Sequence, residues 1–468
     1  MRCMKNYLGQ TVALALIVTV MLVALGFLPS GLRIGGRTLR AMDILSDIRS
    51  EAMPAEDVSP AQDTLLIQLP DNLKAPVVEI PAIDSIDMGV LFEDYSSGQT
   101  RLQAFFAAID SITSRKNTVR VAFFGDSFVE GDIILSNLRD TLQTRWGGEG
   151  VGFVPITSEV ARFRRSLQHT YSNWKTHSIV KRNGGNPPYG INGFVYYPRN
   201  EATIRYEGTS QFRHTGQWSK LRLFYSHASD SGMVFQVNGG TWRPEPLLGS
   251  DNKISVFEYH QQSIRSVAFR FPYTDSLPVY GVSLENGPGF YLDNFAIRGN
   301  TGGALKFIQP STAKAFDELM GYDLIVLQVG LNAVTNSLNN IQWYRMELER
   351  TVKHLKTCFP GRPILMISVG DRGGKVGEEL GTMISVPAIV NMQREVARAN
   401  GLLFFDLFRN MGGEGTMVRF ASEKPALAEK DFTHLTHAGG QVMGNRLATV
   451  FLKEYSRHQT GKSALPLQ

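Results

Sequence analysis

Residues 119–132 read VRVAFFGDSFVEGD, and this stretch decides the fold. Residues 119–124 are mostly β-branched or aromatic, which is typical of a strand buried on both faces. Gly125 ends that run, and the sequence DIILSNLRDTLQTRW, which begins at Asp132, predicts a helix. Ser127 would therefore lie between a strand and a helix, with its hydroxyl exposed and its N–H where negative charge is stabilised. Gly-Asp-Ser is also common in ordinary turns, so this stretch alone leaves both a nucleophile and a simple turn open.

Two later stretches contain the other groups that a serine nucleophile needs. The sequence YDLIVLQVGLNAVTN predicts a second buried strand, residues 324–329, which leads to Asn332. In KDFTHLTHAGGQVMGNRL, Asp431 and His434 stand three residues apart before a helical pattern. Serine becomes a good nucleophile when a base accepts its proton, a carboxylate orients that base, and N–H donors stabilise the oxyanion. We therefore expect His434 to be the base, Asp431 to orient it, and Asn332 to donate to the oxyanion.

The order Gly-Asp-Ser, Gly-x-Asn and Asp-x-x-His resembles that of the SGNH, or GDSL-type, hydrolases. The resemblance covers residues 117–150 and 293–455. It implies a three-layer, flavodoxin-like α/β domain with a mostly parallel sheet, and a serine, histidine and aspartate triad.

The resemblance also implies the composition of the oxyanion hole. In this family the nucleophile contributes its own N–H, here that of Ser127, and a second sequence block contributes a glycine. The stretch DNFAIRGNTGG matches that block, with Gly299 as the candidate and Gly302 as the alternative. Asn332 would supply the third donor.

The sequence after the second block alternates between strand and helix patterns. The segments in order are FDELMGYDLIVLQVG, WYRMELERTVKHLKTC, PILMISVG, VPAIVNMQREVARANG and LLFFDLF. Strands that alternate with helices favour a mostly parallel sheet covered on both faces, with its active site at the carboxyl ends of the strands. We therefore expect one hydrolase domain in two parts, residues 94–150 and 293–468.

Residues 151–292 have a different pattern and are expected to form an inserted β-sandwich-like module. Short alternating runs such as SKLRLFYSH and SIRSVAFRF, separated by Gly and Pro, indicate antiparallel strands. Residues 151–300 contain sixteen Lys and Arg against ten Asp and Glu, and ten of the fifteen tyrosines. A basic, aromatic module could bind a glycan, or its aromatic residues could form its own core. Nucleic acid is not an expected partner, since no recognised binding motif is present.

The N-terminal residues contain an apolar segment that could cross a membrane. Residues 11–28 are eighteen residues without a charge, which predicts a signal anchor over 1–30 rather than a cleaved signal peptide. Residues 31–93 contain spaced prolines and are expected to be a linker. We therefore expect a cell-envelope protein anchored in the inner membrane, with its catalytic part in the periplasm or extracytoplasmic space. Cys3 and Cys358 would lie on opposite sides of that membrane and would not pair.

Several nearby residues have alternative interpretations. Asp126 is expected to be a turn residue that accepts backbone N–H bonds, and Asp406 a cap or turn residue. His437 is the rival of His434 as the base, but the family spacing from Asp431 favours His434. Asp431, His434 and His437 could also suggest a zinc site. It is not expected, because a catalytic zinc normally has three protein ligands and no fuller ligand cluster appears in the sequence. No cofactor is expected either.

An SGNH domain interrupted by a β-module after the nucleophile block resembles the peptidoglycan O-acetylesterases of bacterial envelopes. The resemblance implies that the enzyme removes acetyl esters from cell-envelope polysaccharide. Two alternatives remain open: an O-acetyltransferase that uses the same site, and a non-catalytic glycan-binding envelope protein.

Overall fold

The computed structural model describes residues 91–460, except for 183–184, 227–230, 250–253 and 273–276. It also describes a short strand pair, β1 (Arg33–Ile34) and β2 (Arg37–Thr38). The chain forms two compact units, residues 1–78 and 79–468. Apart from β1 and β2, the predicted anchor and the predicted linker up to residue 90 lie outside the described residues. Among the described residues, no helix is both long and apolar enough to cross a bilayer.

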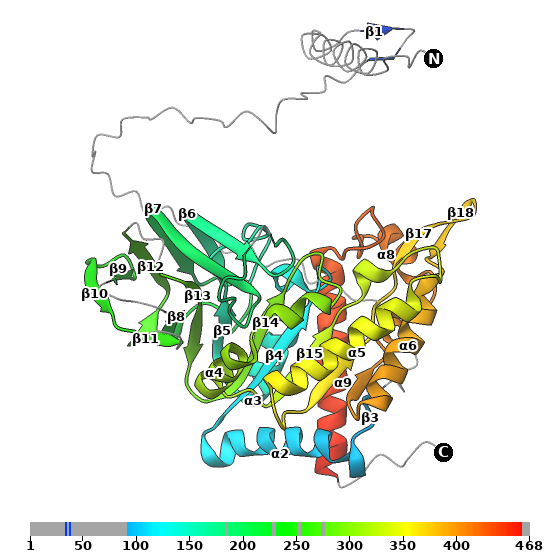
Figure 1. Cartoon of the computed structure of the whole chain (residues 1–468), viewed down its shortest axis with the longest axis horizontal. Helices are drawn as coiled ribbons and strands as arrows, with labels where there is room; N and C mark the ends of the chain where they lie inside the picture. Colours follow the sequence, from blue (N-terminus) through cyan, green and yellow to red (C-terminus); the bar gives the residue numbers. More distant parts are fainter. Residues whose placement is uncertain are drawn as a thin grey trace, which may run out of the picture. The chain divides into compact units, whose positions relative to one another are not determined.

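A six-stranded sheet forms the centre of the second unit (Figure 1). Its order is β14-β4-β15-β16-β19-β3, and all strands except the edge strand β3 are parallel. The strands are β3 (Glu93–Asp94), β4 (Thr118–Gly125), β14 (Gly289–Ala296), β15 (Leu324–Gln328), β16 (Ile364–Ile367) and β19 (Leu403–Phe405). In chain order the parallel strands run 2-1-3-4-5, which is the flavodoxin-like order. A ligand site is therefore expected at the carboxyl ends of β4 and β15, where the strand order reverses.

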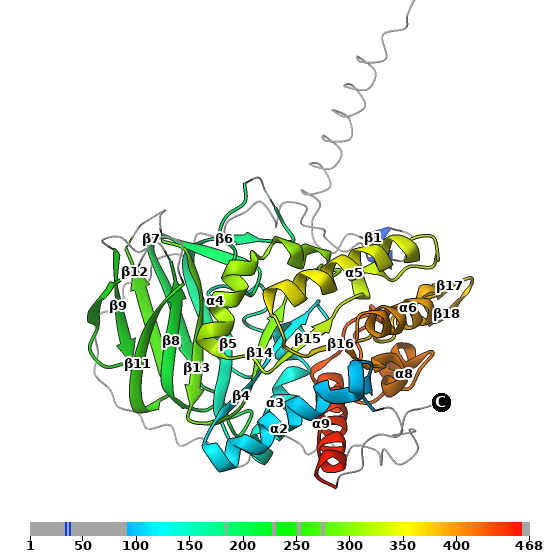
Figure 2. The same cartoon turned by 60° about the horizontal axis from the view of Figure 1, so that its bottom comes forward.

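Helices cover both faces of this sheet (Figure 2). One layer contains α2 (Thr100–Arg115), α3 (Leu135–Trp146) and α9 (His437–Gln459). The other contains α4 (Pro310–Met320), α5 (Ile341–Cys358) and α6 (Ser385–Ala399). The hairpin β17 (Gly373–Val376) and β18 (Glu379–Thr382) and the short helices α7 (Leu407–Met411) and α8 (Thr416–Ser422) complete the domain. The predicted α/β architecture with a mostly parallel sheet is thus confirmed.

Four short 3-10 helices lie in the loops of this domain. They are η1 (Ser97–Gln99), η2 (Glu130–Asp132), η3 (Gly303–Phe307) and η4 (Leu331–Ala333). Three of them follow the ends of β4, β14 and β15, so the loops at the carboxyl edge of the sheet are compactly folded.

The inserted module is an antiparallel structure with its own hydrophobic core. One ladder is β5-β13-β8-β11, the other is β10-β9-β12-β7-β6, and they join where Val279 pairs with Tyr196. The strands are β5 (Glu149–Val154), β6 (Gln168–Ser178), β7 (Phe194–Glu207), β8 (Trp218–Tyr225), β9 (Ser231–Val237), β10 (Arg243–Leu247), β11 (Ser255–Ile264), β12 (Ser266–Phe271) and β13 (Val279–Asn286). Many of its aromatic side chains are buried, so they form core rather than surface.

The two ends of the module meet. The N–H of Phe290 donates to the carbonyl of Gly147 at 2.9 Å, and a Cβ added at Gly289 would lie 2.2 Å from the N of Gly148. The module's first strand begins at Glu149 and β14 already belongs to the central sheet, so the structural boundaries lie two and four residues before those predicted from the sequence.

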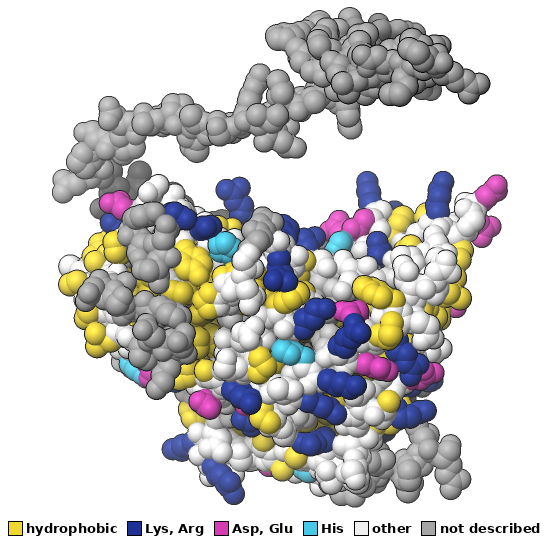
Figure 3. All heavy atoms as spheres, in the orientation of Figure 1, with side chains coloured by type: hydrophobic (Ala, Val, Ile, Leu, Met, Phe, Trp, Pro, Cys, Tyr) yellow, Lys and Arg dark blue, Asp and Glu magenta, His cyan; other side chains and the backbone are white. Residues whose placement is uncertain are grey.

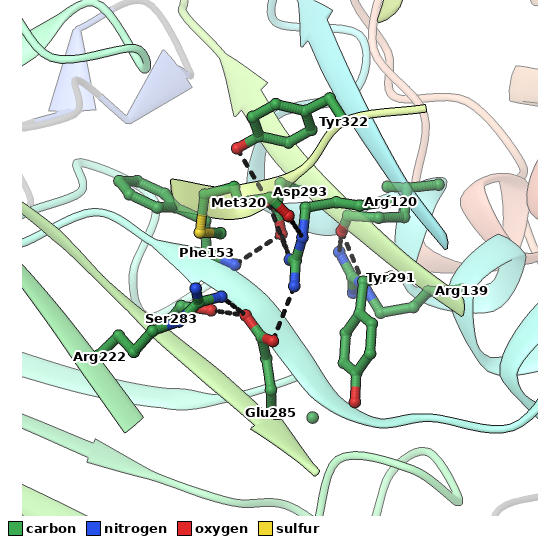
Figure 4. A network of polar contacts seen from close by, with 12 residues as sticks. Arg120, Arg139, Phe153, Arg222, Ser283, Glu285, Tyr291, Asp293, Met320 and Tyr322 are labelled. Carbon is green, nitrogen blue, oxygen red and sulfur yellow. Dashed lines mark hydrogen bonds and ion pairs between the residues drawn. The ribbon is translucent and has the colours of Figure 1, made fainter. Parts of the chain in front are cut away.

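A buried ionic network joins the module to the central sheet (Figure 4). Arg120 on β4 pairs with Asp293 on β14 at 3.1 Å and with Glu285 on β13 at 2.7 Å. Glu285 also pairs with Arg222 on β8 at 2.8 Å. Burial alone would raise the pKa of Glu285, but Arg120 and Arg222 outweigh it and lower that pKa to about 2. Because each charge has a partner of opposite sign, the network fixes the module on the sheet without leaving a buried charge unpaired.

Candidate active site

The structure brings Ser127, His434 and Asp431 together, although the serine is 307 residues away from the histidine in sequence. The hydroxyl of Ser127 lies 3.0 Å from Nε2 of His434, and Nδ1 of His434 lies 2.7 Å from Oδ2 of Asp431. With Nδ1–H donating to the carboxylate, Nε2 is left as the acceptor for the serine proton. This is the geometry of a nucleophile, its base and the group that orients the base.

The loop before α9 holds the Asp431 carboxylate in place. Its Oδ1 accepts the N–H groups of Thr433 at 2.9 Å and His434 at 3.0 Å, and its Oδ2 faces the imidazole. Burial would raise the pKa of Asp431, but the hydrogen bonds from His434 and Thr433 outweigh it and lower the pKa. The carboxylate therefore stays ionised and keeps the imidazole in one tautomer and orientation.

Three glycines at the start of α9 set the depth at which this helix docks. A Cβ added at Gly440 would lie 2.0 Å from the carbonyl oxygen of Ile133, and one at Gly444 would lie 2.6 Å from that of Ile134. At Gly439 it would lie 1.8 Å from the carbonyl oxygen of Leu427. Only residues without a side chain allow this backbone contact. The helix that follows His434 is thereby packed directly on the segment that follows Ser127.

Asp126, the residue before the nucleophile, connects two of the catalytic loops. Its buried carboxylate accepts the N–H of Phe128 at 3.0 Å and, through its other oxygen, the N–H groups of Gly330 and Leu331, both at 3.1 Å. Burial raises the pKa of Asp126 to about 6, although these hydrogen bonds oppose the shift. Asp126 is therefore a backbone acceptor, as predicted, but it also fixes the loop that carries Asn332.

The predicted oxyanion donors follow three adjacent strands. Ala296 of β14 and Gln328 of β15 both lie in register with Gly125 of β4, so the strands end at one level. Ser127, Gly299 and Asn332 come two, three and four residues after these ends.

Hydrogen bonds in the loop that follows β14 distinguish the two candidate glycines, Gly299 and Gly302. The N–H of Gly302 donates to the side chain of Asn300 at 2.8 Å. The N–H groups of Gly299 and Ser127 form no hydrogen bond within the described part of the chain. Gly299 has a φ of 79°, a conformation that favours glycine. The structure therefore favours Gly299 over Gly302 as a donor to substrate.

Asn332 is exposed, and its Nδ2 donates to the carbonyl of Asn300 at 3.3 Å. The buried Asn300 thus contacts both the loop of Gly302 and the side chain of Asn332. Asn300 has no distinctive signal in the sequence, because an Asn beside a glycine in a loop is ordinary turn chemistry.

Three ion pairs beside the nucleophile were also not predicted. Glu130 pairs with Arg298, the residue before Gly299, at 2.7 Å. Burial raises the pKa of Glu130, and Arg298 opposes that shift. Asp132 pairs with Arg139 of α3 at 2.9 Å and with Arg164 of the module at 2.7 Å. The pairs of Glu130 with Arg298 and of Asp132 with Arg164 join segments distant in sequence, so no local pattern could reveal them.

The remaining single-residue predictions can now be placed. His437 is the first residue of α9, and its ring stacks on Phe163 at a centroid distance of 4.2 Å. Asp406 is the N-cap of α7 and accepts the N–H of Arg409 at 2.8 Å. Cys358 is buried and free, and burial raises its pKa to about 12. Cys3 lies outside the described residues.

Within the described residues, no group of three or more His, Cys, Asp and Glu side chains is arranged to hold a metal ion.

Comparison with known proteins gives a match in structure but not in sequence. No protein-family model and no curated protein matches the chain. A solved structure described as "Peptidoglycan O-acetylesterase in action, 5 min" superposes with a TM-score of 0.62 at 19% identity, covering 78% of this chain and 99% of that one. The chain therefore has a fold similar to that of a peptidoglycan O-acetylesterase. The predicted resemblance to SGNH hydrolases of this type is confirmed at the level of the fold.

A family two carbohydrate esterase from Cellvibrio japonicus is also similar, with a TM-score of 0.25 at 9% identity, over 61% of this chain and 99% of that one.

Proposed function

We propose that the protein is a serine esterase that removes O-acetyl groups from cell-envelope glycan, specifically peptidoglycan. The observation that carries this proposal is the continuous contact from Ser127 Oγ to His434 Nε2 and from His434 Nδ1 to Asp431 Oδ2. The fold shared with a peptidoglycan O-acetylesterase supports the choice of substrate. The predicted anchor in residues 11–28 supports a place in the inner membrane with the catalytic part in the periplasm.

In the first half of the reaction, the base His434 takes the proton of Ser127 while the serine oxygen attacks the acetyl carbonyl carbon. The carbonyl oxygen becomes an oxyanion, which accepts hydrogen bonds from the N–H groups of Ser127 and Gly299 and from Nδ2 of Asn332. The tetrahedral intermediate then collapses. The sugar oxygen leaves with the proton from His434, and an acetyl-serine remains.

In the second half, His434 takes a proton from water, which attacks the acetyl-serine carbonyl. Acetate leaves and the proton returns to the oxygen of Ser127. Throughout the cycle Asp431 stabilises the imidazolium without taking its proton.

The test is acetate release from O-acetylated peptidoglycan by the full chain, compared with acetylated xylan. The Ser127→Ala variant should fold normally and lose about 10³-fold or more in turnover. Equal turnover by wild type and variant would contradict the esterase mechanism. Faster hydrolysis of xylan than of peptidoglycan would contradict the proposed substrate.

A further inference from the structure

The loop between β5 and β6, residues 155–167, places an aromatic ring beside both catalytic loops. The ring of Phe163 stacks on His437, with 23° between the ring planes. It also lies over Gly131, where an added Cβ would be 3.1 Å from Cδ1 of Phe163. Gly131 follows Ser127 by four residues, and His437 follows His434 by three. The module therefore contributes Phe163 to the rim of the candidate active site.

This ring is held in place but is not buried. Phe163 is 40% exposed, while its N–H donates to the carbonyl of Val160 at 3.0 Å. The next residue, Arg164, is tied to Asp132 at 2.7 Å. An exposed aromatic ring on an ordered loop can receive a ligand at a small entropic cost, because little is ordered on binding.

A polar cavity of about 560 Å³ lies next to this loop. Its lining consists of Arg164, Arg165, Gln168 and residues 208–211, which include no Asp or Glu. The exposed side chain of Arg165 forms no ion pair or hydrogen bond within the described part of the chain. Arg165 follows Phe163 by two residues in this loop, and burial and the charge of Arg165 both lower the pKa of His437. The cavity therefore offers a cation without a neighbouring anion in its lining.

We propose that Phe163 and Arg165 form a subsite for a sugar that carries a carboxylate, beside the ester attacked by Ser127. This subsite rests on the proposed esterase function, since it would bind the same glycan. The electron-rich face of the phenyl ring suits the C–H groups of a sugar ring. The guanidinium matches the planar geometry of a carboxylate and can bind it through two parallel hydrogen bonds.

The test measures binding without turnover. Soluble peptidoglycan glycan strands, freed of O-acetyl groups by mild base, are titrated calorimetrically into the full chain. Chitooligosaccharides of the same length serve as the uncharged comparison. We expect the wild type to bind the carboxylated strands about tenfold more tightly, and Arg165→Gln to remove that preference. Phe163→Leu, which keeps an apolar side chain but removes the ring face, should weaken both ligands about three- to tenfold.

Arg162→Gln is the matched control, because Arg162 is an exposed arginine of the same loop that does not line the cavity. Melting temperatures of all variants should agree with that of the wild type. Equal effects of the Arg162 and Arg165 substitutions, or an unchanged preference in Arg165→Gln, would overturn the subsite. Because the ligands carry no acetyl ester, this result is independent of whether Ser127→Ala abolishes hydrolysis.

Discussion

Asp126 binds Gly330 across the switch point of the sheet: the carboxylate of the residue before the nucleophile accepts the N–H of the glycine that follows β15. One side chain therefore fixes the relative position of two loops, those of Ser127 and Asn332. The burial of this carboxylate gives a measurable pH dependence.

Asp126→Asn should lower both stability and turnover. The amide would place an NH₂ group against the N–H of Phe128 or against those of Gly330 and Leu331, so at least one donor would lose its acceptor, at about 1–3 kcal/mol. The folded pKa of about 6 exceeds the unfolded value, so in the wild type this group makes the protein less stable as pH rises from about 4 to 6. Urea unfolding from pH 4 to 7 measures the free energy of unfolding. In the Asp126→Asn variant, this free energy should lack the decrease that the titration of Asp126 causes in the wild type. An identical pH dependence in both proteins would contradict the role of Asp126.

Asn332 is expected to act in the transition state. Asn332→Asp keeps the size of the side chain but removes the N–H donor and adds a negative charge beside the oxyanion. Turnover of a small acetyl ester should fall about 10²- to 10³-fold or more, with little change in KM. Asn332→Ala should show a similar loss from the missing donor alone. A change confined to KM would instead assign Asn332 to substrate binding.

His434 and His437 should behave very differently when replaced. His434→Ala removes the group that faces Ser127, so we expect a loss of about 10³-fold or more in turnover of a small acetyl ester. His437→Ala removes only the stacking partner of Phe163 and should cost less than about tenfold. Steady-state kinetics on both variants provides the measurement. The reverse order of effects would mean that the site is assigned to the wrong histidine.

Gly440 is expected to tolerate no side chain. In Gly440→Ala the new Cβ meets the backbone carbonyl of Ile133, which cannot rotate away, so α9 must shift. Overpacking of this kind costs about 1–3 kcal/mol, and the displaced helix should also lower turnover by moving His434. Gly381→Ala is the matched control, because its added Cβ would meet nothing within 4 Å. Similar melting temperatures for the two variants would refute this account of the docking.

Glu285 is expected to make the protein sensitive to acid. Its folded pKa of about 2 lies below the unfolded value of about 4.3, so its contribution to stability is present above about pH 4.3 and is lost as pH falls towards 2. Glu285→Gln should cost about 3–5 kcal/mol at pH 7, because Arg120 and Arg222 lose their shared partner. Glu207→Gln, in an exposed pair with Arg205, should change stability by less than about 1 kcal/mol. Chemical unfolding at pH 7 and pH 3 measures both effects, and a small loss in Glu285→Gln would contradict the importance of the network.

The parts of the structure that could be predicted from sequence are those encoded locally. The buried run of β4 and the amphipathic patterns of α5 and α6 are continuous in sequence. The contact of Asp431 with His434 spans only three residues. The hairpin of β17 and β18 was missed, because its glycine-rich and charged strands alternate only weakly.

The contacts that could not be predicted depend on how distant segments meet. The hydrogen bonds from Gly330 to Asp126 and the pairing of Arg120 with Glu285 join residues more than 150 positions apart. The position of Phe163 at the rim likewise follows from the docking of the module, which leaves no local trace in the sequence.

The meeting of the two ends of the module has a consequence for how the chain folds. Strand β14 must pair with β4 across an intervening segment of about 160 residues, 126–288, a closure that is entropically costly for a flexible chain. When the module folds first, it brings Gly148 and Gly289 into contact, and the same pairing then closes only the crossover through α3, residues 126–148. We therefore expect substitutions in the core of the module, far from Ser127, to slow the appearance of activity during refolding.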